Sequence, residues 1–261
     1  MTASISLDFT PQVEYLLRIA DTCLILGQRL GEWCGHAPVL EEDIALTNVA
    51  LDLIGQTRAL LTRAAEIEGR GRDRCFTEDQ LAFLREERDY RNLTIAELPR
   101  GDFAFTVLRN LMLGTWLKLH WDQLQHSSDA DLAAIAGKAV KEARYHQQHA
   151  ADWVVRLADG TDESRRRVEK ALAELWRFVP EMFAVDAIDD AAVASGLGPA
   201  RSALREAWSA EIAVVFDAAR LSPPAEAAFR STGTLGVHSE HLGRMLAEMQ
   251  FLQRAFPGGT W

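Results

Sequence analysis

Hydrophobic residues recur along this chain at alternating three- and four-residue intervals, the spacing that places side chains on one face of an α-helix. The second long segment of this kind is apolar on most sides, which predicts a central helix. No run alternates between apolar and polar residues as a β-strand does. The pattern predicts four long helices, at 12–30, from just after 38 to about 68, at 102–125 with Asp102 as its N-cap, and from about 129 to 158.

The remaining segments predict shorter helices around these. The stretch 77–93 is rich in charged residues and is interpreted as a short surface helix over a connecting loop. Further helices are expected at 161–183, 200–221 and 234–255, with a loop and one helical turn in 184–200. The crossover between the second and third long helices favours an all-α fold, a ferritin-like four-helix bundle with additional C-terminal helices. We expect 1–261 to be a single domain of this type.

Composition narrows the class of protein. The 261 residues suffice for a sizeable core, and 48% hydrophobic with 25% charged residues is ordinary for a globular protein. The formal charge of −10 argues against binding to nucleic acid or to an anionic membrane. Cys23, Cys34 and Cys75 form no CxxC pair, no apolar run reaches the roughly 18 residues of a membrane span, and no leader pattern is present. We therefore expect a cytoplasmic protein.

One helical face with polar residues at its middle is the main candidate for chemistry. Positions 132, 135, 139, 142, 146, 149 and 153 share a face of the fourth long helix, and they hold Leu, Ile, Ala, Glu, His, His and Trp. An acid and two imidazoles on a buried face are costly unless each has a partner. That partner is a metal, a substrate or another side chain.

The chain departs from the pattern of a di-iron centre. A bundle with such a centre takes one Glu from each of two helices and Glu-x-x-His from each of the other two. In this chain Gly55 and Tyr145 occupy the positions where the two histidines of that pattern are expected. His146 is one residue after Tyr145. The positions concerned are Asp21 on the first helix, Asp52 and Gly55 on the second, and Glu142, Tyr145 and His146 on the fourth.

The third long helix argues most strongly against a metal site. It has no carboxylate from 103 to 121, and its central polar residues include Arg109 and Lys118. A cationic side chain at the level of the site would repel metal ions. One interpretation is a degenerate metal site, in which Arg109 or Lys118 pairs with the three carboxylates across the bundle. The alternatives left open are carboxylates that reach solvent without a role, and an unusual ligand shell that still binds metal.

Five runs of the sequence resemble one known family of proteins. The runs are GQRLGEWCGHAPVLEEDIALTNVALDLIGQ, LAFLREERDYRNLTIAELPRGDFA, KAVKEARYHQQH, LWRF and AEMQFLQRAFPGGTW. They resemble the C subunits of bacterial phenylacetyl-CoA epoxidase, also called ring-1,2-phenylacetyl-CoA monooxygenase, and the resemblance covers nearly the whole chain. It implies a ferritin-like structural subunit of a cytoplasmic oxygenase complex in aerobic phenylacetate degradation.

The resemblance also implies partners and cofactors. A separate catalytic subunit holds the di-iron centre and binds phenylacetyl-CoA, and a reductase with flavin and an iron–sulfur cluster passes electrons from NADPH. Our first hypothesis is a scaffold that pairs with this catalytic subunit through its first two helices, with no metal, cofactor or catalytic residue of its own. The second is an oxygenase in which Asp21, Asp52, Glu142 and His146 hold iron. A homodimer of the isolated chain remains open.

Overall fold

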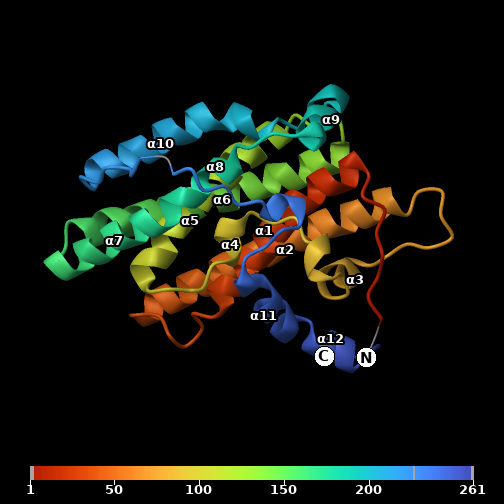
Figure 1. Ribbon diagram of the computed structural model, residues 1–261, viewed down its shortest axis with the longest axis horizontal. Helices are drawn as coiled ribbons and strands as arrows, with labels where there is room; N and C mark the ends of the chain where they lie inside the picture. The colour runs from red at the N-terminus through yellow and green to blue at the C-terminus, as the bar shows by residue number, and fades with distance from the viewer. Residues whose placement is uncertain (1–2, 226, 260–261) are drawn as a thin grey trace.

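Four long helices form the body of the protein. The computed structural model describes residues 3–225 and 227–259. α1 and α2 form one helical hairpin and α5 and α6 form another, with the crossover 69–102 between them. The predicted four-helix bundle is therefore confirmed. Its helices are α1 (Pro11–Gly31), α2 (Leu40–Glu68), α5 (Phe103–Leu124) and α6 (Ala130–Ala158) (Figure 1).

Side chains at the N-termini fix where these helices begin. The Asp102 carboxylate accepts a hydrogen bond of 2.9 Å from the backbone N–H of Phe105, as predicted for an N-cap. Asp129 caps α6 in the same way, and Thr10 caps α1. Because these contacts are local, the sequence pattern alone places the starts of these bundle helices.

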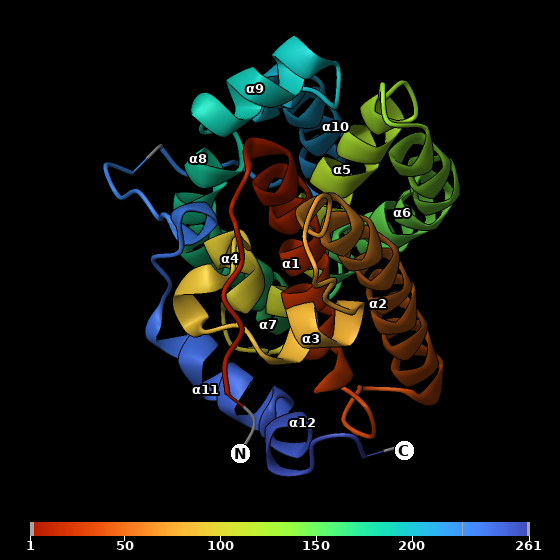
Figure 2. The ribbon, with the colours of Figure 1, turned by 90° about the vertical axis from the view of Figure 1, so that its right-hand side faces the viewer.

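The central helix is α1 rather than α2. Figure 2 shows α1 in the middle of the molecule with other helices around it, and nearly every residue from Val13 to Leu30 is buried. The prediction that α2 is central is wrong, because its apolar residues do not all face the core. Leu40, Ile44 and Leu51 are 72%, 53% and 63% exposed. A helix that is apolar on most sides can pack on a core with one face and leave another face for a partner.

The second half of the crossover between α2 and α5, from 81 to 98, is largely buried, which corrects in part the interpretation of 77–93 as a surface helix. Arg85, Tyr90 and Leu93 are almost inaccessible to solvent. The charged residues of this stretch suggested exposure to solvent, but an arginine can be buried when it has a partner. Arg85 forms such an ion pair with Asp21 of α1. The crossover contains α3 (Glu78–Phe83), η1 (Glu87–Asp89) and α4 (Thr94–Glu97).

Shorter helices after α6 cover the bundle. The predicted helix 161–183 is interrupted after Leu175, where a 3-10 turn precedes Pro180, a residue with no N–H to donate. The helix expected from 234 onward begins at Glu240. No helix in the described ranges is both long and apolar enough to cross a membrane. The elements are α7 (Asp162–Leu175), η2 (Trp176–Phe178), α8 (Val179–Met182), α9 (Ala187–Ser195), η3 (Arg201–Leu204), α10 (Arg205–Ala218), η4 (Gly233–Leu235), α11 (Glu240–Met249) and α12 (Phe251–Ala255).

Two buried carboxylates fasten the segment before α11 to the crossover. Glu97 accepts a hydrogen bond of 2.5 Å from the backbone N–H of Ser239 and lies 2.9 Å from Nδ1 of His238. Glu181 accepts from the backbone N–H of Thr94, at the start of α4, and from that of Thr234, both at 3.1 Å. Each carboxylate thus satisfies backbone donors that helix ends and loops leave free.

The buried His120 of α5 is held as a neutral ring. Its Nε2 lies 2.9 Å from the hydroxyl of Tyr15, which donates to the carbonyl of Pro199, also at 2.9 Å. The hydroxyl has one hydrogen, so Nε2 of His120 must carry the ring proton. Burial, and to a smaller extent the guanidinium of Arg201, lowers the pKa of His120 to about 3.

This burial predicts a loss of stability in acid. Below its ordinary pKa of about 6.5, His120 takes up a proton in the unfolded chain but not in the folded one. Between pH 7 and pH 5 the free energy of unfolding is expected to fall by about 2 kcal/mol at this residue. Urea titrations across this pH range test it, with His120→Gln as the comparison because an amide does not titrate. Equal pH slopes for the two chains would contradict the prediction.

Candidate functional site

The polar residues on one face of α6 are paired with side chains of α2. Nε2 of His146 lies 2.9 Å from Oδ2 of Asp52, and Nε2 of His149 lies 2.9 Å from Oε2 of Glu42. Similar contacts continue along both helices, where the Gln56 amide donates to Glu142 at 3.0 Å and Arg63 donates to Asp129 at 2.8 Å. We call this set the α2–α6 seam: Glu42, Asp52, Gln56 and Arg63 on α2, with Glu142, His146 and His149 on α6 and its N-cap Asp129.

Pairing within the seam offsets the desolvation cost of burying these polar side chains on a packed helix face. Burial lowers the pKa of His146, while the Asp52 carboxylate opposes the shift. Asp52 is the more accessible partner, with 39% of its side chain exposed against 5% for His146. A neutral imidazole that donates to a half-exposed carboxylate needs no metal to satisfy it.

Two positions chosen from the sequence lie on the outside of the bundle. Gly55 is exposed with open space around it, and Tyr145 is 54% exposed. In the same turns the inward positions are Leu53 and Gln56 on α2. The ligand pattern, read from Asp52 to Gly55 and from Glu142 to Tyr145, is therefore displaced by one residue from the positions that face the centre of the bundle. This part of the sequence interpretation is corrected.

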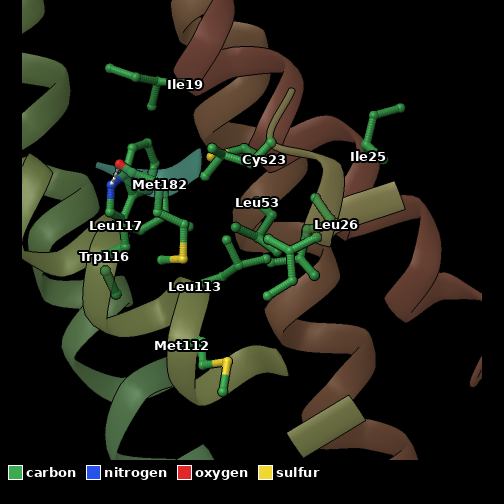
Figure 3. Close-up of a cluster of buried hydrophobic side chains, with 14 of the residues drawn as sticks. Ile19, Cys23, Ile25, Leu26, Leu53, Met112, Leu113, Trp116, Leu117 and Met182 are labelled. Carbon is green, nitrogen blue, oxygen red and sulfur yellow. Dashed lines mark hydrogen bonds between the residues drawn. The ribbon is translucent and has the colours of Figure 1, made fainter. Parts of the chain in front are cut away.

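Apolar side chains fill the centre of the bundle. Figure 3 shows Leu53 and Leu113 in the space between α5 and the α1–α2 hairpin, and both are almost inaccessible to solvent. Met182 of α8 belongs to the same buried cluster, and its carbonyl accepts a hydrogen bond of 3.1 Å from the indole of Trp116. The core at this level is packed as an ordinary hydrophobic interior.

The predicted pairing of carboxylates with Arg109 or Lys118 is wrong. Asp21 is paired with Arg85, whose Nη1 donates to it at 2.9 Å, and both side chains are fully buried. Arg109 donates to the backbone carbonyl of Leu98 at 2.7 Å.

Lys118 is not paired with a bundle carboxylate either, and Asp52 and Glu142 have their partners in the seam. Lys118 pairs with Glu211 of α10 rather than with an acid of the bundle. The structure brings Asp52, Glu142 and His146 together in the seam and leaves Asp21, Arg109 and Lys118 apart from it. The crossover and α10 provide partners that a comparison of the four long helices could not reveal.

The donor set at the centre does not fit a di-iron centre. Two of the polar groups on its inward faces are the thiol of Cys23 and the amide of Gln56, which lie 3.7 Å apart. Burial raises the pKa of the Cys23 thiol, so the thiol keeps its proton. Within the described residues, no three His, Cys, Asp or Glu side chains are grouped so that they could hold a metal ion. Two packed cations need several carboxylates, and these positions do not provide them.

Sequence reasoning named Asp52 but missed the other α2 residues of the seam, although a signal was present. Glu42, Asp52, Gln56 and Arg63 are separated by ten, four and seven residues, which places them within one stripe of a helix. Their match to polar positions on α6 could have indicated direct pairing. No comparable signal marked Arg85, because nothing local distinguishes it from the other arginines of its segment.

A stripe of exposed apolar residues runs along one face of α2. We define the α2 stripe as Leu40, Ile44 and Leu51. On α6 the exposed ring of Tyr145 stacks on His149 of the seam at a centroid distance of 6.1 Å. Exposed large apolar side chains along one helix face are typical of a protein contact surface.

Two comparisons with known proteins place this chain among proteins of phenylacetate catabolism. The family described as "Phenylacetic acid catabolic protein" matches residues 3–261. The chain is also 48% identical over 247 residues to the C subunit of the 1,2-phenylacetyl-CoA epoxidase of Escherichia coli (strain K12). That match covers 95% of this chain and 98% of the relative.

Proposed function

Since this chain belongs to the phenylacetic acid catabolic protein family, we propose that it is a structural subunit of a phenylacetyl-CoA epoxidase complex in phenylacetate catabolism. In this role it keeps the shape of a di-iron bundle, binds no metal and pairs with the subunit that carries out the chemistry. The role needs an interior unsuited to iron and a surface suited to a partner.

The apolar centre of the bundle is the observation that carries the proposal. In a di-iron bundle the four helices direct carboxylates and imidazoles inward. Here the inward positions include Leu53 and Leu113, which have no atom that binds a metal. Charged ligands could enter this packed core only at a large desolvation cost. The interior is thus suited to holding a shape rather than to redox chemistry.

The α2–α6 seam supports the same role. In a metal-containing bundle the ligands connect the helical hairpins through the ions. In this chain, hydrogen bonds such as His146 to Asp52 and Gln56 to Glu142 connect the α1–α2 hairpin directly to the α5–α6 hairpin. The charge-assisted pair of Arg63 and Asp129 adds a further link near the end of α2.

The partner and its cofactors complete the proposal. The di-iron centre and the phenylacetyl-CoA site belong to a catalytic partner subunit, and electrons reach it from NADPH through a reductase with flavin and an iron–sulfur cluster. The α2 stripe is the contact surface for that catalytic subunit, since it exposes Leu40, Ile44 and Leu51 without a partner in the described chain. The complex acts in the cytoplasm, and 1–261 works in it as one domain.

Substitution of the seam separates this role from the alternative of an oxygenase with an unusual iron shell. The double variant Asp52→Asn with His146→Gln keeps a hydrogen bond between the two side chains but removes the carboxylate and the imidazole. In the assembled complex, epoxidase turnover per complex should change by less than about twofold, because no group that reacts has been altered. Native mass spectrometry confirms equal assembly. Loss of about 100-fold or more from fully assembled complex would support the oxygenase alternative.

A further inference from the structure

An aromatic groove lies on α10, away from the bundle centre and the seam. Its volume is about 500 Å³, and seven apolar residues form its walls. The indole of Trp208 is buried at its base and donates to the carbonyl of Met112 at 2.9 Å, which fixes the floor of the groove. We call it the α10 groove, and its apolar lining is Trp176, Trp208, Ile212, Ala213, Phe216, Leu221 and Pro223.

The walls of the groove have the geometry of a preformed apolar site. The ring centroids of Trp176 and Trp208 are 6.0 Å apart, and those of Trp176 and Phe216 are 5.9 Å apart. These spacings are those of aromatic pairs in contact, so the rings are held in place before anything binds. The site can therefore accept a large apolar group with little loss of side-chain freedom.

The polar residues at the rim indicate what kind of group this is. Ser209 and Asp217 are exposed and are the polar side chains that line the groove. A site for a small metabolite usually has several polar groups directed at the ligand, and this groove lacks them. A large apolar side chain inserted from another protein, by contrast, needs apolar walls and a polar rim.

The charged and apolar residues around the groove indicate which residues of the partner would lie beside the inserted side chain. Asp217 and Glu206 are exposed on α10, and within the described residues neither forms an ion pair. Val214, one turn from the rim of the groove, is 71% exposed. A partner segment with a basic residue beside its apolar side chains would match this combination.

We infer that the α10 groove binds a second partner subunit, which inserts an aromatic or large aliphatic side chain and places a lysine or arginine opposite Asp217. In Figure 2, α5 and α6 lie between α10 and α2. The groove and the α2 stripe can therefore be occupied at the same time, so this chain joins two different partners. The inference rests on the proposed role as a subunit of a complex.

A matched pair of substitutions on α10 tests the inference. Ala213→Glu places a carboxylate in the wall of the groove, whereas Ala207→Glu makes the same change on an exposed part of the helix outside it. The complex is assembled from its subunits with each variant and analysed by native mass spectrometry. Ala213→Glu should weaken the binding of one partner by at least about 30-fold and leave the partner on the α2 stripe in place. Ala207→Glu should retain every partner.

The other occupants of the groove give distinct results. A complete complex with Ala213→Glu would overturn the inference. So would equal losses with both variants, or a change confined to self-association, which would assign the groove to a second copy of this chain. A change in tryptophan emission on addition of phenylacetate, with no partner lost, would assign it to a small aromatic molecule. If the unaltered chain binds none of the other subunits, the proposed function fails first, independently of the groove.

Discussion

Arg85→Met is expected to lower the free energy of unfolding by about 3–5 kcal/mol, the usual cost of removing one partner of a buried ion pair. Arg85 and Asp21 are both fully buried, and Nη1 of Arg85 donates to the carboxylate at 2.9 Å. The backbone N–H of Arg91 donates to the same carboxylate at 2.8 Å and is the main donor that the variant leaves. Asp21 must then remain charged with too few donors or take up a proton.

Two further variants show whether the loss comes from the buried pair. Asp21→Leu combined with Arg85→Met removes both charges and should recover most of the loss, because no unpaired charge remains. Arg58→Met removes an exposed arginine, 68% accessible, that pairs with Glu78, and should cost less than about 1 kcal/mol. Urea titration measures all of these variants. An Arg85→Met chain as stable as Arg58→Met would contradict the structure of the crossover.

Leu51→Glu is expected to abolish co-purification with the catalytic subunit, with affinity reduced by at least about 100-fold. Leu51 is 63% exposed and belongs to the α2 stripe. A carboxylate there would lose its hydration inside an apolar contact without gaining a partner. The stability of the isolated chain should change little, because the side chain is exposed before assembly.

Val193→Glu is the matched control for this substitution. Val193 lies on α9 and is 54% exposed, so the change also places a carboxylate on an exposed apolar position, but far from α2 along the chain. It should leave co-purification intact. Normal pairing by Leu51→Glu, or equal loss with both variants, would show that the α2 stripe is not the contact surface.

The four bundle helices could be predicted because their signals are local. Apolar periodicity gives each helix its length, and a side chain such as Asp102 caps the turn that follows it in sequence. The place of each helix in the bundle could not be predicted in the same way. Both α1 and α2 are rich in apolar residues, and only the three-dimensional packing shows that α1 is enclosed while Leu51 of α2 faces solvent.

The candidate site was predicted in part for the same reason. The polar face of α6 was recognised from spacing, and His146 does lie in the packed seam. The choice of partners failed because pairing depends on contacts between distant segments. Arg85 lies in a stretch whose charges resemble a solvent-exposed surface, yet it neutralises Asp21, 64 residues away. The one-residue displacement of the ligand pattern at Asp52 arose because spacing defines a stripe but not its direction.

Metal analysis of the purified chain, expressed alone in metal-replete medium, tests the central claim most directly. Iron, zinc and manganese are measured by mass spectrometry on protein whose folding is verified by thermal unfolding. The structural role predicts a metal content near zero in fully folded protein, since the centre of the bundle is filled by residues such as Leu53 and Leu113. About one or two iron ions per chain, lost on Glu142→Ala, would contradict it and reopen the oxygenase alternative.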